Sequence, residues 1–212
     1  MFGREIRDSR SDKEMLDEAV QAARQADVIV AAIGETSEFS GECASRTDLT
    51  IFDAQKDLLT ALKATGKPVV LVNFSGRSTV MNWENDNFSA ILNVWFGGSE
   101  AGDAICDVLF GDKVPSGRLT VSMPKSVGQL PLYYNHLNTG RPQPEGRPFE
   151  KFRSNYIDID NNPLYPFGYG LSYTTFKYGP LQLDANSMTV DGQIKVTVPV
   201  TNTGNRDADE VV

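Results

Sequence analysis

One segment of the sequence carries most of the side chains that could transfer a proton. Residues 34–49, GETSEFSGECASRTDL, contain four carboxyl groups and a single arginine, Arg46. The four carboxyl groups belong to Glu35, Glu38, Glu42 and Asp48. Carboxyl groups serve as general acids and bases, so this density indicates a place where such chemistry is possible. For each one considered singly, a solvated acidic loop is the simpler interpretation. Glu42 differs mildly from the rest because Gly41 beside it permits close backbone approach.

Other candidates for chemistry have less support. His136 is the only histidine and has no serine-nucleophile motif near it, so we expect a structural or substrate-facing loop histidine. Residues 97–105, GGSEAGDAI, lack the GxGxxG spacing, and no Walker-type motif is present, so these glycines indicate a tight turn. Cys43 and Cys106 lie far apart without metal-ligand spacing, which predicts two buried free thiols and no metal site.

Composition narrows the class of ligand. The chain has 212 residues, 40% of them hydrophobic and 23% charged, which is typical of a globular protein with no membrane-spanning segment. A net charge of -8 leaves no basic stripe for a phosphate backbone, so nucleic-acid binding is disfavoured and a neutral substrate such as a sugar fits better. Trp83, Trp95 and Phe39 could stack on sugar rings, but Trp95 lies inside a buried-strand pattern and is expected in the core.

The elements that position the acidic segment follow a strand–helix alternation. Continuous apolar runs predict strands, covered on both faces, at residues 28–34, 69–75 and 90–96. Helical spacing, a Ser11/Glu14 capping box and closing glycines predict helices at residues 11–26, 53–65 and 100–110. This order indicates an open, mostly parallel sheet with helices on both faces. Ligands bind outside the carboxyl ends of such strands, where the acidic segment begins.

The residue composition and the hydrophobic pattern change in the last third of the sequence. Residues 143–148 are rich in proline and glycine and predict a linker without regular structure. Alternating valines and isoleucine at residues 194–200 predict a strand, and residues 202–204 a turn, as in the first hairpin of a β-sandwich. Because a sandwich needs roughly 100 residues, we expect the chain to end inside a domain.

Four stretches resemble glycoside hydrolase family 3, especially its bacterial periplasmic β-glucosidase branch. The most specific is YPFGYGLSYTTF at residues 165–176, and the others are residues 41–49, 95–119 and 126–142. The resemblance implies a three-layer α/β/α sandwich over residues 1–140, a linker over 141–175 and part of a fibronectin-type-III-like domain over 176–212. It also implies a catalytic barrel ahead of the sandwich, and a periplasmic or secreted full-length enzyme.

The resemblance further implies retaining hydrolysis of β-glycosides. An aspartate nucleophile comes from the barrel, and the acid/base glutamate falls in the Gly-Glu step that here reads Gly41-Glu42. Such hydrolysis needs two carboxyl groups about 5–5.5 Å apart and neither metal nor cofactor, so the chain alone should be inactive. Phe39 and Arg46 are candidates for contact with the β-glucoside or oligosaccharide substrate.

Glu42 must keep its proton near neutral pH, which nearby Glu35, Glu38 and Asp48 would favour and Arg46 would oppose. A non-catalytic carbohydrate-binding or scaffolding domain is the alternative. A nucleotide-binding domain is weakened by the missing phosphate loop.

Overall fold

The computed structural model describes residues 8–137, 140–144 and 146–212. The chain forms two compact units, Met1–Gly98 with Val121–Pro166 and Ser99–Thr120 with Phe167–Val212. Within the predicted linker at 143–148, Glu145 lies outside the described residues, and the described ones contain no helix or strand.

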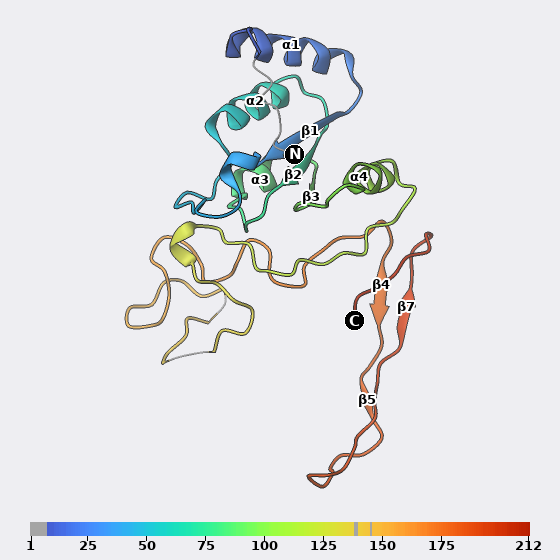
Figure 1. Cartoon of the computed structure of the whole chain (residues 1–212). Helices are drawn as coiled ribbons and strands as arrows, with labels where there is room; N and C mark the ends of the chain where they lie inside the picture. The colour runs from blue at the N-terminus through green and yellow to red at the C-terminus, as the bar shows by residue number, and fades with distance from the viewer. Residues whose placement is uncertain (1–7, 138–139, 145) are drawn as a thin grey trace. The chain divides into compact units, whose positions relative to one another are not determined.

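A three-stranded parallel sheet forms the centre of the first unit. Its strands are β1 (Ile29–Gly34), β2 (Val69–Phe74) and β3 (Ala90–Asn93), in the order β1-β2-β3 (Figure 1). Ala31 pairs with Leu71, and Leu71 with Ile91, so all three strands end at one edge. This sheet with flanking helices, followed by small antiparallel strand pairs, confirms the predicted α/β class.

The described residues of the first unit form the α-helices α1 (Asp12–Gln25), α2 (Asp53–Lys63) and α3 (Asn82–Asn87) and the 3-10 helices Ser37–Phe39 and Val127–Gln129. The predicted capping box is present, with the Glu14 backbone N–H donating to Ser11 Oγ at 3.3 Å and the Ser11 backbone N–H donating to the Glu14 carboxylate at 2.7 Å. Helix α3 was not predicted, because NWENDN is polar and too short to show a helical period.

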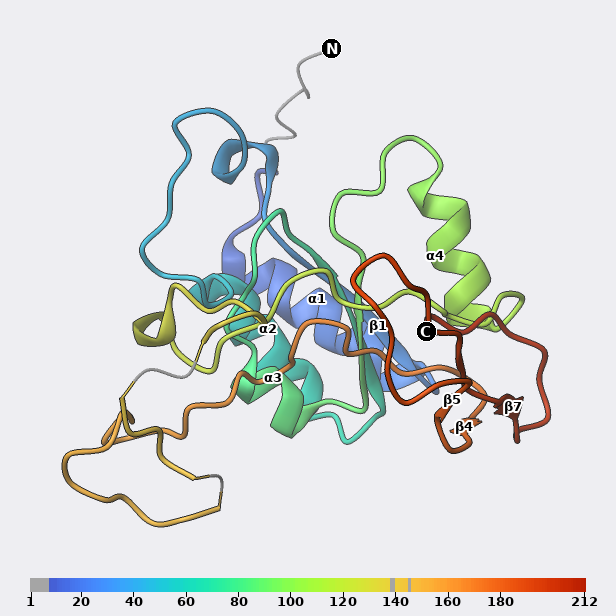
Figure 2. The ribbon, with the colours of Figure 1, turned by 90° about the horizontal axis from the view of Figure 1, so that it is seen from below.

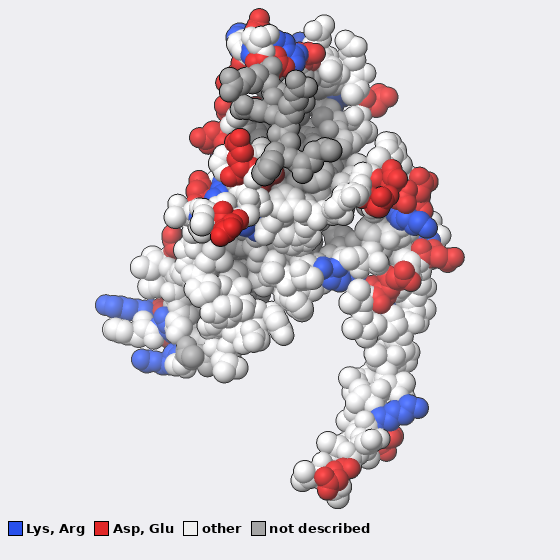
Figure 3. Space-filling view, viewed as in Figure 1, with Lys and Arg blue, Asp and Glu red and all other residues white. Residues whose placement is uncertain are grey.

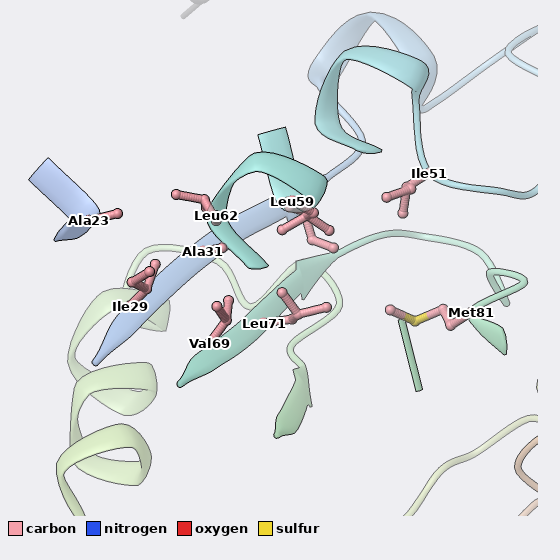
Figure 4. Close-up of a cluster of buried hydrophobic side chains, with 10 residues drawn as sticks. Ala23, Ile29, Ala31, Ile51, Leu59, Leu62, Val69, Leu71 and Met81 are labelled. Atoms are coloured by element: carbon pink, nitrogen blue, oxygen red, sulfur yellow. The ribbon is translucent and has the colours of Figure 1, made fainter. Parts of the chain in front are cut away.

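The core lies between helices α1 and α2 and one face of the sheet (Figure 4). Ile29, Ala31 and Ile33 are buried there, whereas Val30 between them is 51% exposed. The expectation that all three strands are covered on both faces is therefore wrong for β1 and β3, which are edge strands, and β3 has no fully buried residue. Only β2 between them is the buried central strand.

The second unit contains one helix and two antiparallel strand pairs. Helix α4 (Ala101–Phe110) ends at Gly111, whose φ of 82° is the left-handed cap expected of glycine. Strands β4 (Phe176–Tyr178) and β7 (Val200–Asn202) pair, as do β5 (Gln182–Leu183) and β6 (Val196–Thr197). Figure 1 shows them as one long ribbon. The strand predicted at 194–200 is interrupted at Pro199, which has no N–H to donate.

The core predicts a large effect of shortening one central side chain. Leu71 in β2 is 0% exposed, so Leu71→Ala should lower the free energy of unfolding by about 2–5 kcal/mol. Leu171→Ala, at an exposed position, should change it by no more than about 0.5 kcal/mol. Denaturant unfolding followed by circular dichroism measures both, and equal losses would contradict this description of the core.

Candidate functional site

The site is built where β1 ends. Gly34, the last residue of β1, has a φ of 130°, and a Cβ there would lie 1.8 Å from the Phe74 carbonyl oxygen. Gln55 in α2 holds the Gly34 backbone on both sides, accepting from its N–H at 3.0 Å and donating to its carbonyl at 2.8 Å. The Glu35 N–H then donates to the Phe74 carbonyl at 2.7 Å. Only glycine fits this close approach, and it fixes where the acidic loop starts.

Glu35 is a buried, ion-paired carboxylate. Its side chain is 2% exposed, and one oxygen accepts from Arg77 at 2.6 Å and from Arg46 at 3.0 Å. The other oxygen accepts from Ser75 Oγ at 3.1 Å and from the Gly76 N–H at 3.3 Å. Burial alone would raise the pKa of Glu35, but the donors Arg46, Ser75 and Arg77 outweigh it, so the pKa is lowered. Glu35 therefore stays ionised and is poorly suited to donating a proton.

Arg77 connects this buried charge to the rest of the loop. Its Nη1 also donates to the Phe39 carbonyl at 2.7 Å, and its Nη2 donates to the Ala44 carbonyl. These two carbonyls lie on either side of Glu42 in the sequence. Arg77 thus fastens both flanks of the segment that contains Glu42.

Glu42 lies in a tight turn between those flanks. Gly41 has a φ of 109° and Cys43 a φ of 59°, and the Ala44 N–H donates to the Gly41 carbonyl at 3.3 Å. A positive φ is unfavourable for cysteine and persists only where surrounding contacts impose it. Glu42 itself is exposed to solvent, so its carboxyl group is accessible to a substrate.

The other two carboxylates of the loop differ from each other. Asp48 accepts from the Thr50 N–H at 2.9 Å and from its hydroxyl at 2.8 Å, and these bonds lower the pKa of Asp48. Glu38 lies exposed in the short 3-10 helix Ser37–Phe39. Arg46 is directed at Glu35, to which its Nη1 donates at 3.0 Å.

Phe39 and Arg46 both pack on Phe52. The rings of Phe39 and Phe52 have centroids 4.5 Å apart, and the Arg46 guanidinium lies 4.4 Å from the Phe52 ring centre. Arg46 also donates to the Thr50 carbonyl at 3.1 Å. Phe39 stays 40% exposed. Their contact with substrate stays a prediction.

The two tryptophans lie far from this loop in the sequence. Trp83 on α3 packs against the core and meets Phe88 edge-on at 5.3 Å. Trp95 follows β3 with a φ of 51° and is only partly buried, so its predicted place inside a buried strand is wrong.

The two cysteines are free, as expected, but the prediction that they are buried is wrong, because Cys43 and Cys106 are both exposed. Cys43 lies in a loop turn, and Cys106 lies at an exposed position of α4. The apolar character of cysteine did not reveal that either position is exposed. His136 is exposed, with its backbone N–H bonded to the Tyr133 carbonyl at 3.2 Å. Over residues 8–137, 140–144 and 146–212, no group of three or more His, Cys, Asp or Glu is arranged to hold a metal ion.

The surface and the helices add two observations. On the face in Figure 3 the Lys and Arg side chains are scattered among acidic and uncharged residues, so that face presents no continuous basic track. Among the helices that the structure describes, none combines the length and the apolar character that crossing a membrane requires.

Arg77 and Ser75 were missed by the sequence reasoning. They follow the carboxyl end of β2, just as the acidic loop follows β1. Figure 2 shows the ribbon of the loop that leaves β1. The rule that pointed to the loop after the first strand would have found them if it had been applied to the second strand as well.

Comparison with protein families matches residues 3–173 to the glycosyl hydrolase family 3 C-terminal domain. The chain belongs to this family. It is 54% identical over 205 residues to a periplasmic beta-glucosidase of Salmonella typhimurium, covering 97% of this chain and 27% of that protein. A beta-xylosidase of Formosa agariphila is 44% identical, with 94% of this chain and 27% of that protein covered.

Solved structures agree with this assignment. A beta-glucosidase from Listeria innocua in complex with glucose superposes with a TM-score of 0.86 at 37% identity, covering 92% of this chain and 27% of that one. The same enzyme in complex with gluconolactone gives a TM-score of 0.85 at 38% identity, covering 91% and 27%. The chain therefore spans about a quarter of the length of these relatives.

The buried ion pairs predict how stability depends on pH. Because the pKa of Glu35 is lowered from 4.5, ionised Glu35 stabilises the fold fully above about pH 4.5, and this contribution is lost as the pH falls through the lowered value. Glu35→Gln should cost about 3–5 kcal/mol of unfolding free energy at pH 7, since it leaves two arginines poorly paired.

Urea unfolding from pH 7 to pH 3 tests this expectation. The difference between wild type and Glu35→Gln should be constant above about pH 5 and shrink below about pH 4.5. Glu38→Gln, an exposed glutamate of the same loop, is the control and should change stability little at any pH. A Glu35→Gln difference that grows on acidification would contradict the prediction.

Proposed function

We propose that this chain supplies Glu42 as the acid/base of a retaining β-glycosidase. The observation that carries the proposal is the division of roles within the loop. Glu35 is buried and held ionised by two arginines, and Asp48 is bonded to Thr50, whereas Glu42 is presented to solvent in a turn that Arg77 fastens on both sides. A proton carrier must be accessible and held within reach of its acceptor. Glu42 is exposed, and Arg77 holds the backbone on both sides of it.

In the proposed reaction, Glu42 acts twice. As an acid it donates its proton to the glycosidic oxygen while an aspartate of the barrel attacks the anomeric carbon and forms a covalent intermediate. As a carboxylate it then takes a proton from the water that hydrolyses this intermediate, which restores the starting form. The fold of this chain contributes the position of Glu42, and a low-dielectric surrounding arises only when the two domains meet over the substrate.

Relatives support the wider proposal. The substrate is a β-glucoside or an oligosaccharide with a terminal β-linked sugar, since the relatives are beta-glucosidases and a beta-xylosidase. The partner is a barrel domain of the same protein, in agreement with the share of the relatives that this chain spans. We place residues 1–140 in the sandwich domain, 141–175 in the linker and 176–212 in a fibronectin-type-III-like domain. The full-length enzyme is periplasmic or secreted, as the periplasmic relative suggests.

The isolated chain should be inactive. A single carboxyl group leaves no route through a covalent intermediate, so incubation with an aryl β-glucoside should match the buffer blank. Release of the aryl group is followed by absorbance. Enzyme-dependent turnover from a preparation proven free of contaminating glycosidase would place both catalytic groups within these residues and overturn the division between domains.

In the full-length enzyme, Glu42→Ala should slow hydrolysis to a degree that depends on the leaving group of the substrate. A sugar alkoxide needs the acid, so hydrolysis of a β-linked disaccharide should fall by about 10²- to 10⁴-fold. A dinitrophenolate leaves without protonation, so kcat/KM on the dinitrophenyl glycoside should fall much less. Azide should restore part of the turnover and yield a β-glycosyl azide.

Glu38→Ala is the control for this experiment, because Glu38 is an exposed glutamate of the same loop, and it should not show the dependence on the leaving group. Glu35→Ala is not suited as a control, because it leaves Arg46 and Arg77 without their carboxylate. Near wild-type cleavage of disaccharides by Glu42→Ala, or the leaving-group pattern in Glu38→Ala, would remove the assignment from Glu42.

A further inference from the structure

We infer that Arg77 is a positioning residue that holds the acid/base carboxyl group in its working place by fastening the backbone on both sides of Glu42. The inference rests on the role proposed for Glu42. Arg77 itself is not expected to touch the substrate, because its donors are engaged within the loop.

A single guanidinium reaches three acceptors. Arg77 Nη1 lies 2.6 Å from a Glu35 oxygen and 2.7 Å from the Phe39 carbonyl oxygen, and Nη2 donates to the Ala44 carbonyl. Phe39 precedes the turn and Ala44 ends it. The ends of the turn are therefore held by one rigid, planar group, which keeps their relative position fixed.

The backbone of Arg77 is in turn held at the end of the sheet. Its backbone N–H donates to Ser75 Oγ at 3.0 Å, directly after β2. Ser75 Oγ donates to Glu35, directly after β1. Because β1 and β2 pair up to Gly34 and Phe74, the ends of both strands determine where Glu35 and Arg77 meet. The sheet therefore determines the position of the turn, because Glu35 and Arg77 connect the strand ends to it.

Arginine suits this role better than lysine. A guanidinium offers five N–H donors in a planar fork, whereas an ammonium group is a compact point donor on a flexible stem. Lysine at this position could keep the charge beside Glu35 but could not hold the Phe39 and Ala44 carbonyls in the same fixed geometry. Loss of the clamp should leave the strained turn at Gly41 and Cys43 free to relax and move Glu42.

A small displacement of a catalytic group is costly to the rate. A misplacement of about 1 Å can cost on the order of 10²-fold. If Arg77 acts through Glu42, its loss should slow the hydrolysis of substrates whose leaving group needs an acid. Hydrolysis of substrates whose leaving group needs no acid should change little. A residue that only stabilises the fold would impair both to the same degree.

The test compares variants of the full-length enzyme on a β-linked disaccharide and on the dinitrophenyl glycoside. Arg77→Ala should lower kcat on the disaccharide by roughly 10- to 100-fold with little change in KM, and should lower kcat/KM on the activated substrate by less than about threefold. Arg77→Lys should retain stability better than Arg77→Ala and show the same selectivity, so it serves if the alanine variant does not fold. In the double variant with Glu42→Ala, the Arg77 substitution should add no further loss on the disaccharide.

Arg118→Ala is the matched control. Arg118 is 20% exposed, pairs with Glu210 at 2.6 Å and donates to the Gly170 carbonyl, so it is an arginine of comparable burial and bonding in the second unit. Its loss should lower the melting temperature and leave the ratio of the two activities unchanged.

The outcomes separate the two proposals. If Glu42→Ala itself shows no dependence on the leaving group, the proposed function fails. If Glu42→Ala shows it but the Arg77 variants impair both substrates equally, or the losses multiply in the double variant, only the positioning role of Arg77 is overturned.

Discussion

The arrangement of the acidic loop depends on one buried charge. Removing the Glu35 carboxylate from water costs several kcal/mol, and the fold tolerates it only because four donors surround its two oxygens. Two of these donors are arginines that also bind carbonyl groups of the loop. The same carboxylate that must be compensated therefore organises the backbone around Glu42. The carboxylates of this loop therefore differ in their surroundings: Glu35 is buried and ion-paired, whereas Glu42, the proposed proton carrier, is exposed.

Much of the fold could be predicted because it follows from local patterns. Apolar runs indicated the strands β1, β2 and β3, and the capping box and closing glycines indicated α1, α2 and α4. The burial of each strand depends on neighbours in space. An apolar run does not reveal whether its strand is central or at an edge, so the exposed face of β1 was not predicted. Helix α3 is polar and too short to show a helical period. The interruption at Pro199 was missed although the proline, which lacks an N–H, is visible in the sequence.

The candidate site shows the same limit more sharply. Glu42 was assigned by resemblance, whereas its support could not be predicted, because Glu35 and Arg77 are 42 residues apart and meet only through the register of β1 on β2. Sequence reasoning expected Glu35 and Asp48 to act as negative neighbours of Glu42. In the structure both are occupied with partners of their own. Their types and spacing were visible in the sequence, but the direction of each side chain was not.

A crystal structure of the full-length enzyme trapped as its covalent glycosyl intermediate tests the central claim most directly. The distance to measure runs from the Glu42 carboxyl group to the carboxyl group that bears the sugar. The account predicts about 5–5.5 Å, the separation that retaining hydrolysis requires, with Arg77 still bonded to the carbonyls on either side of Glu42. A different carboxyl group at that distance, with Glu42 pointing away from the sugar, would contradict it.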